Sequence, residues 1–276
     1  MTSTHLPRRI PLNLTVAAVL VTCALSGAGS PADRHETSPA ASSPVTARVP
    51  ARVTPSAPTA TGARLPDLAM LPLEAFHVAY EGNRKVLRFS ADMENLGRGP
   101  LDVTGVRSST RTPYLKVTQN ISLGAKKWRR VRTRAVMRYS TLDGHNHFHI
   151  MNFERYRLRE VGSTTWRVDH KEGFCMRDDG NLGGQTAFHY EDDCGSDAPR
   201  SLRVGQGLSQ GWVDVYDWYL EGQSIELAGL HLPGYFCVSA TVDPLNQLTE
   251  KTRANNTTSS LIYVTQSRAT ALRQPC

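Results

Sequence analysis

The sequence lacks several features that would assign it to a common class of protein. It has no long hydrophobic run, since the apolar stretch Leu12–Leu20 is too short to cross a bilayer as a stable anchor. No CxxC spacing occurs among its five cysteines, which argues against a thiolate metal site. The formal net charge of +7 is too small to indicate nucleic-acid binding. With 39% hydrophobic residues, the composition is that of an ordinary globular protein.

Helical periodicity is also missing from the sequence. Short runs with partial alternation of apolar and polar residues occur instead, and turn residues such as Asn95–Pro100 separate them. The expected strands are Val86–Met93, Arg130–Arg138, Phe148–Leu158, Ile225–Leu227, Tyr235–Val242 and Ser260–Val264. This pattern predicts an all-β fold, an Ig-like β-sandwich with long functional loops.

The N-terminus has the layout of an export signal. A short basic segment, His5–Arg9, precedes the apolar stretch, and small residues follow, so we expect the signal to cover residues 1–30. Cys23 follows a segment that resembles a bacterial lipobox, so two outcomes stay open: a secreted protein, or one anchored to the cell membrane by a lipid on Cys23. Residues 31–64 are rich in Pro, Ala, Ser and Thr and predict a disordered spacer, which leaves residues 65–276 as the folded domain.

Four cysteines remain in the expected domain, and an even number in an exported domain suggests two disulfide bonds. The sequence allows three pairings. We favour Cys175–Cys194, which would close a short polar loop, and Cys237–Cys276, which would pin the C-terminal tail.

Two charged segments each have two interpretations. The basic segment Lys126–Arg130 continues with Arg132, Arg134 and Arg138, and predicts either a solvated edge strand or a surface for anionic envelope polymers. The acidic residues of Asp178–Asn181 and Glu191–Asp193 indicate either a plain polar loop or a site for calcium or cationic amines. Neither segment predicts nucleic acid as a partner.

Three histidines alternate with other residues at His145, His147 and His149. Alternate side chains of an extended strand share one face, so the three imidazoles can converge on one ion. Imidazole is a good ligand for copper, zinc, iron and nickel, and three protein ligands leave coordination positions open for water, oxygen or substrate. The pattern predicts a catalytic type of metal site, and the ligands alone do not choose the metal.

Three motifs resemble those of the lysyl oxidase family. The His-x-His-x-His run, followed by aromatic residues, resembles the family's copper-binding segment. His170–Cys175 resembles its His-Lys-x-x-Phe-Cys motif, and Gly207–Tyr216 resembles its Gly-Leu-Ser-x-Gly-x-x-Asp-x-Tyr motif. The motifs occur in the family's order, and the similarity covers roughly residues 65–265. The segment Arg177–Arg200 differs from the animal pattern, which leaves the disulfide pairing and the substrate groove open.

The resemblance implies a copper-dependent amine oxidase. In the family, the residues that match Lys171 and Tyr216 fuse into the cofactor lysine tyrosylquinone. That cofactor and molecular oxygen convert a primary amine, such as a protein lysine or a small amine, into an aldehyde, ammonia and hydrogen peroxide. Lys171 has to react as the free base, so we expect a lowered pKa for its amine. Asp214, two residues before Tyr216, is the candidate general base, although a carboxylate that orients the loop is an equal alternative.

Two competing functions remain. A copper-binding envelope protein without turnover would need the histidines but neither Lys171 nor Tyr216. A zinc hydrolase would need a carboxylate base near the metal; Asp143 and Glu154 are available, but no known zinc-protease motif is met. The presence of the lysine and the tyrosine in matching motifs favours the oxidase.

Overall fold

A computed structural model of the chain describes residues 62–141, 146–181, 183, 189–190, 194–272, 274 and 276. Of residues 169–172 it describes the backbone. The expected export signal lies outside the described residues, as do His145 and all but the last three residues of the expected spacer. Within the described part of the chain, no helix is long and apolar enough to cross a membrane.

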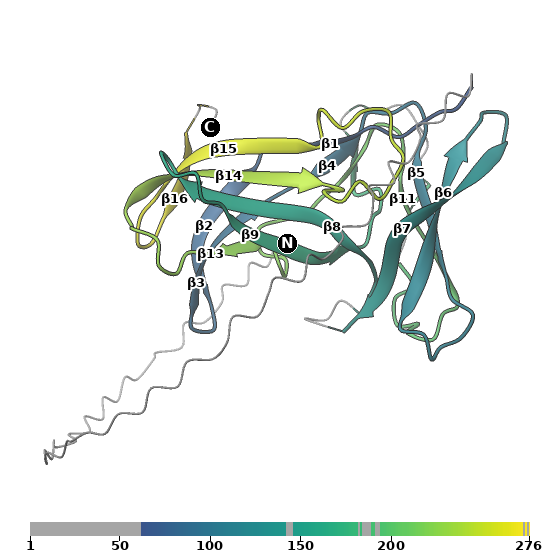
Figure 1. Cartoon of the computed structure of the whole chain (residues 1–276), viewed down its shortest axis with the longest axis horizontal. Helices are drawn as coiled ribbons and strands as arrows, with labels where there is room; N and C mark the ends of the chain where they lie inside the picture. Colours follow the sequence, from purple (N-terminus) through teal and green to yellow (C-terminus); the bar gives the residue numbers. More distant parts are fainter. Residues whose placement is uncertain are drawn as a thin grey trace, which may run out of the picture. The chain divides into compact units, whose positions relative to one another are not determined.

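One large antiparallel sheet contains most of the strands (Figure 1). Its order is β11-β5-β6-β7-β8-β14-β15-β16, and β9 pairs with β8. These strands are β5 (Leu101–Val106), β6 (Tyr114–Ser122), β7 (Trp128–Ser140), β8 (His147–Glu160), β9 (Arg167–Phe174), β11 (Arg203–Leu208), β14 (Gly234–Val242), β15 (Thr257–Val264) and β16 (Ala269–Leu272).

Two smaller antiparallel sheets complete the described fold. One has the order β1-β4-β12-β10, with β1 (Leu68–Met70), β4 (Met93–Asn95), β12 (Trp212–Asp214) and β10 (Gly180–Asn181). The other has the order β13-β3-β2, with β13 (Ser224–Glu226), β3 (Arg84–Ser90) and β2 (Glu74–Glu81). The described residues contain no helix, so the all-β class is confirmed, while the Ig-like sandwich arrangement stays a prediction.

The expected strand Val86–Met93 is divided between two sheets. β3 ends at Ser90, and β4 begins at Met93. Between them, the Ala91 amide donates a hydrogen bond to the Tyr216 carbonyl (3.0 Å), and the Asp92 carboxylate accepts one from the Tyr216 amide (2.8 Å). The strand is interrupted because its backbone turns to bind the segment that carries Tyr216.

β7 is not simply an edge strand, which corrects one interpretation of the basic segment. It lies between β6 and β8 in the large sheet. Its last four residues, Met137–Ser140, pair with β8, whereas Trp128–Arg132 and Val136 pair with β6 alone, with a register shift between Arg132 and Val136. One face of this first part of β7 points out of the core, since Trp128, Arg130, Arg132 and Arg134 are exposed.

The core joins the small β13-β3-β2 sheet to the middle of β8. Phe89 of β3 meets Tyr156 of β8 edge to face, with ring centroids 4.9 Å apart. Phe153 of β8 meets Phe174 of β9 in the same manner at 5.9 Å. All four side chains are buried, and burying each stabilises the fold by roughly 1.5–3 kcal/mol. β8 and β9 therefore form a rigid base for the residues at their ends.

The first expected disulfide is present and the second is not. Cys175 and Cys194 are bonded, with their Cα atoms 5.7 Å apart. Cys237 and Cys276 are free thiols, one buried in β14 and one exposed at the C-terminus. Partial burial of its thiol, together with a hydrogen bond between the two side chains, raises the pKa of Cys276 to about 12. The structure thus holds this pair together in its reduced form.

Candidate functional site

The two described histidines of the alternating run converge, as the sequence predicts. His147 and His149 lie on one face of β8, and their Nε2 atoms are 2.8 Å apart. Phe148, between them, points to the other face, where its ring packs edge to face on Tyr139 at 5.1 Å. His149 is buried and His147 is half-buried. The alternation of side chains along β8 therefore places Phe148 in the core and the two potential metal ligands on the opposite face.

Gly173 allows β9 to approach His149 closely. In the register of β8 and β9, Gly173 lies opposite Met151, and Phe174 lies opposite Ile150. A Cβ atom added to Gly173 would lie 2.4 Å from the Cβ of His149, closer than two carbon atoms can pack. The glycine of the His170–Cys175 motif thus has a structural role that the motif alone did not assign: it fixes where the β8 histidine can sit.

Tyr216 is buried and held from several sides. Its hydroxyl donates to the carbonyl of Cys175 (3.2 Å) and accepts from the amide of Cys175 (3.1 Å). Its ring packs on Phe174, with centroids 4.2 Å apart. Its backbone carbonyl accepts a hydrogen bond from the side-chain amide of Gln223 (3.0 Å). Burial, together with the negative charges of Asp214 and Asp179, raises the pKa of Tyr216 well above its usual value, so the phenol is neutral at physiological pH.

One cavity of about 290 Å³ contains the histidines and the tyrosine. The residues that line it are His147, His149, Cys175, Arg177, Asp179, Ser196, Asp214, Val215, Tyr216 and Leu220. Asp214 is buried at the end of β12, two residues before Tyr216, and both face this cavity as expected. Arg177 and Asp179 form an ion pair in its wall, with 2.6 Å between Nε and Oδ1. Four of the predicted site residues, His147, His149, Asp214 and Tyr216, therefore come together.

A family model described as Lysyl oxidase matches residues 105–274, more than half of the chain. The chain belongs to the lysyl oxidase family. No curated protein matches the chain. The matched range contains the histidine run, Lys171, Asp214 and Tyr216. Membership of the lysyl oxidase family implies an amine oxidase, and the family is known for copper and lysine tyrosylquinone.

The geometry of the two described histidines fits the copper of lysyl oxidases. Two imidazole nitrogens bound at right angles to one ion, each ~2.0 Å from it, are ~2.8 Å apart, and tetragonal nitrogen sites suit Cu(II). The Nε2 atoms of His147 and His149 have this separation. The described residues, which do not include His145, contain no group of three or more His, Cys, Asp or Glu side chains placed to hold a metal. Two of the three predicted ligands thus fit.

Lys171, the other half of the family's cofactor pair, lies in β9 directly opposite Glu154 of β8. Glu154 is buried, and its Oε2 accepts a hydrogen bond from the hydroxyl of Tyr156 (2.5 Å). That hydroxyl also contacts Oε1 of Gln223 (2.5 Å), whose amide donates to the carbonyl of Tyr216. A continuous set of polar contacts therefore joins the strand position opposite Lys171 to the backbone of Tyr216.

The sequence did not reveal this polar network. The sequence offers Glu154 only as a base for a zinc hydrolase, and no motif points to Gln223. The one available signal was the position of Glu154 five residues after His149, within the region of family similarity. Glu154 is hydrogen-bonded in the core and is not among the described residues that line the histidine cavity.

The structure describes the first part of the acidic segment, which includes Asp178. Asp178 is buried, and its carboxylate accepts hydrogen bonds from the backbone amides of Ser209 (2.7 Å), His189 (3.1 Å) and Tyr190 (3.3 Å). These contacts tie three segments together. Asp178 is thus a structural residue of the loop, while Glu191–Asp193 lie outside the described residues.

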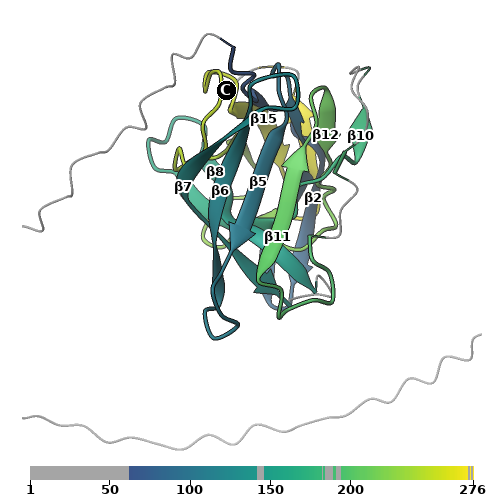
Figure 2. The same ribbon diagram turned by 90° about the vertical axis from the view of Figure 1, so that its right-hand side faces the viewer.

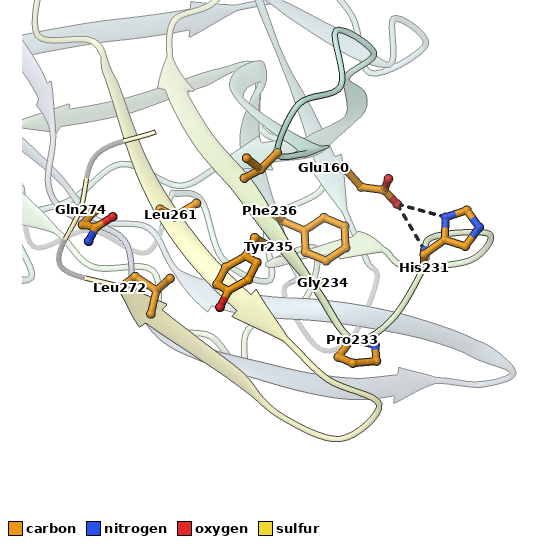
Figure 3. Close-up of a pocket in the computed structure, with 10 residues that line it drawn as sticks. Glu160, His231, Pro233, Gly234, Tyr235, Phe236, Leu261, Leu272 and Gln274 are labelled. Atoms are coloured by element: carbon orange, nitrogen blue, oxygen red, sulfur yellow. Dashed lines mark hydrogen bonds and ion pairs between the residues drawn. The ribbon is translucent and has the colours of Figure 1, made fainter.

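A separate cavity of about 660 Å³ lies at the far end of β8 (Figure 3). Here Glu160, the last residue of β8, accepts a hydrogen bond from the amide of His231 (3.2 Å). Tyr235, Phe236 and Leu272 form part of its wall. It shares no lining residue with the histidine cavity. His147, His149, Asp214 and Tyr216 therefore line the smaller cavity and not this one.

Proposed function

We propose that this protein oxidises primary amines to aldehydes, with copper and a lysine tyrosylquinone formed from Lys171 and Tyr216, and releases ammonia and hydrogen peroxide. The observation that carries the proposal is the shared cavity of His147, His149 and Tyr216 in a chain of the lysyl oxidase family. A copper-binding protein without turnover would not require a buried tyrosine beside the histidines.

His145, His147 and His149 would hold the copper. When bound, copper and dioxygen would supply the oxidising equivalents that turn the Tyr216 ring into a quinone, which then takes electrons from the amine. The protein contributes the position of the ring. The backbone of Cys175 holds the hydroxyl, and Phe174 covers the ring, so Tyr216 presents a defined edge to the cavity.

Asp214 is the proposed general base. Its carboxylate lines the cavity beside Tyr216, and a carboxylate there can accept the proton that leaves the α-carbon of the amine. Together with Asp179, it adds negative charge to the cavity, and Arg177 balances part of that charge.

The size of the cavity limits the substrate. About 290 Å³ is at the lower end of the range for small-molecule pockets. An alkylamine or a single lysine side chain would fit, and both are primary amines. The Cys175–Cys194 disulfide suits an extracellular enzyme, whether secreted or anchored through Cys23.

Hydrogen peroxide release tests the proposal. The copper-loaded protein is incubated with n-butylamine, 1,5-diaminopentane and a lysine-containing peptide in air, and peroxide is measured with a coupled peroxidase. We expect turnover with at least one amine, and none after Tyr216→Phe or Lys171→Arg. Activity that survives both substitutions would contradict the assigned cofactor. If the protein contains the quinone but oxidises none of these amines, the cofactor assignment stands and only the choice of substrates is wrong.

A further inference from the structure

The outer face of β7 carries a row of arginines. Arg130, Arg132, Arg134 and Arg138 are exposed, and all lie at even positions of the strand. Alternate residues of a strand lie on one face, ~7 Å apart where the strand is regular, so Arg130 and Arg132 are neighbours in the row. At odd positions the side chains are half-buried or, as with Ala135 and Met137, buried. The row faces solvent, and it is interrupted at half-buried Val136, next to a register shift between β7 and β6.

The charges of this row are not neutralised within the described part of the chain. Arg134 donates a hydrogen bond to the carbonyl of Leu245 (3.0 Å), and the side chains of Arg130, Arg132 and Arg138 meet no described acceptor. Elsewhere, by contrast, arginines pair with carboxylates, as Arg88 does with Glu81 at 2.7 Å. Like charges on one strand face repel each other, so an anionic partner would relieve this repulsion.

The neighbouring strand adds no compensating charge to the row. Asn120 and Thr118 of β6 lie opposite Arg130 and Arg132, and both are neutral. Exposed Lys116, one residue pair further along, adds positive charge. Figure 2 shows β7, β6, β5 and β11 side by side as one open layer of the sheet. The basic row thus lies on a broad and accessible surface.

A cavity of about 440 Å³ lies where the row begins. Arg64, Arg98, Asp102, Ser122, Trp128 and Tyr190 form part of its lining. The carboxylate of Asp102 accepts hydrogen bonds from Tyr190 (2.9 Å) and Asn120 (2.6 Å), whereas the side chains of Arg64 and Arg98 meet no described acceptor. Trp128 is 48% exposed and belongs to both features, since it is the first residue of β7. The cavity and the row form one continuous site.

The chemistry of this site matches a linear, negatively charged sugar polymer. The planar guanidinium group of arginine binds carboxylates and sulfates through paired hydrogen bonds. An exposed indole offers a flat apolar surface with a polar edge, against which the apolar face of a sugar ring can pack. A single row of arginines that starts at a cavity suits a linear chain with one ring in the cavity. We propose that the β7 row and the Trp128 cavity bind an acidic polysaccharide, with one charged sugar ring in the cavity and the chain along the arginines.

The Trp128 end of this site is separate from the proposed oxidase chemistry. The Trp128 cavity shares no lining residue with the cavity of His147, His149 and Tyr216. The other end of the row, Arg138, lies opposite His149 in the register of β7 and β8, so only the Trp128 end is distinct from the amine site. The two proposals rest on different residues, and a failure of one leaves the other intact.

Titration calorimetry of the full-length protein tests the proposal, with oligogalacturonate as the carboxylated probe, a heparin oligosaccharide as the sulfated probe, and dextran as the neutral control. We expect binding to at least one acidic probe, weakened by salt, and none to dextran. The triple variant R130S/R132S/R138S should lose affinity about tenfold or more, equivalent to at least ~1.4 kcal/mol. Trp128→Ala should weaken binding without changing its salt dependence.

The matched control is R84S/R200S/R268S, which removes the same charge from exposed arginines outside the row. We expect it to keep affinity within about twofold, and both triple variants to keep the thermal midpoint of the parent protein. Equal losses in the two triple variants would overturn the proposal in favour of a nonspecific charge effect. Tighter binding to anionic lipid vesicles or to RNA than to both acidic sugars would overturn the choice of polymer.

Discussion

The hydroxyl of Tyr216 lies between the amide and the carbonyl of Cys175, at 3.1 Å and 3.2 Å. Cys175 is in turn bonded to Cys194, so the group that orients the ring belongs to a cross-linked segment. The link between a disulfide and a buried phenol connects the stability of the fold to the position of the proposed cofactor.

Removal of this disulfide should affect both stability and the cofactor. The bond closes a loop with a sequence separation of 19, for which loss of the cross-link costs about 3 kcal/mol. We expect Cys175→Ser/Cys194→Ser to lower the free energy of unfolding in urea by about that amount and to reduce the yield of quinone. Cys237→Ser/Cys276→Ser is the control, because neither cysteine lines the cavity of His149 and Tyr216. A quinone yield equal to that of the parent protein would show that the disulfide is not needed to position Tyr216.

Gly173→Ala should displace His149. The added methyl group would lie 2.4 Å from the Cβ of His149, and such overpacking costs about 1–3 kcal/mol. We expect copper affinity, measured by competition with a chelator, to fall at least about tenfold, by analogy with loss of a residue that orients a metal ligand. Gly205→Ala is the matched control in β11, since nothing lies within 4 Å of its added Cβ. Equal copper affinity in both variants would refute the role given to Gly173.

Tyr156→Phe should show how much the polar network of Glu154, Tyr156 and Gln223 contributes to stability and to quinone formation. The substitution keeps the ring against Phe89 but leaves Glu154 and Gln223 without the hydroxyl that joins them. An unmade hydrogen bond to a buried group costs about 1–3 kcal/mol. We expect that loss in urea unfolding, with a lower quinone yield at unchanged copper content. An unchanged quinone yield would show that the network serves stability alone.

Glu250 should make stability depend on pH. Burial raises the pKa of Glu250 from 4.5 to about 7, although Asn256 and Arg253 oppose this shift. Because the folded-state pKa is raised, the protonated form stabilises the fold fully below pH 4.5, and this contribution is lost as the pH rises to about 7. The loss is at most about 3 kcal/mol. Urea unfolding of Glu250→Gln should lack this decline, whereas an identical decline would assign it to other groups.

The features that can be predicted from the sequence are those that depend only on the geometry of a single strand. Alternation along β8 places His147 and His149 on one face because residues two apart in a strand always share a face. The split of Val86–Met93 was not predictable, since its cause is a pair of hydrogen bonds to Tyr216, more than 120 residues away in the chain. The role of Gly173 likewise depends on the register of β8 and β9, which one sequence does not specify.

The thiol pair shows a similar limit. The even number of cysteines predicted two disulfides, and the contact between Cys237 and Cys276 supports their pairing in space. Whether they are bonded depends on the oxidant that the protein meets, which the sequence does not encode. Glu154 was available to sequence analysis, but its contact with Tyr156 and its position opposite Lys171 became evident only with the strand register.

Peptide mass spectrometry tests the central claim most directly. The copper-loaded protein is incubated in air, treated with phenylhydrazine to trap a quinone, and digested. The account predicts one cross-linked peptide pair that joins Lys171 to Tyr216 and carries the hydrazine. Separate, unmodified peptides containing Lys171 and Tyr216, at full copper occupancy, would contradict it and leave a copper-binding protein without turnover.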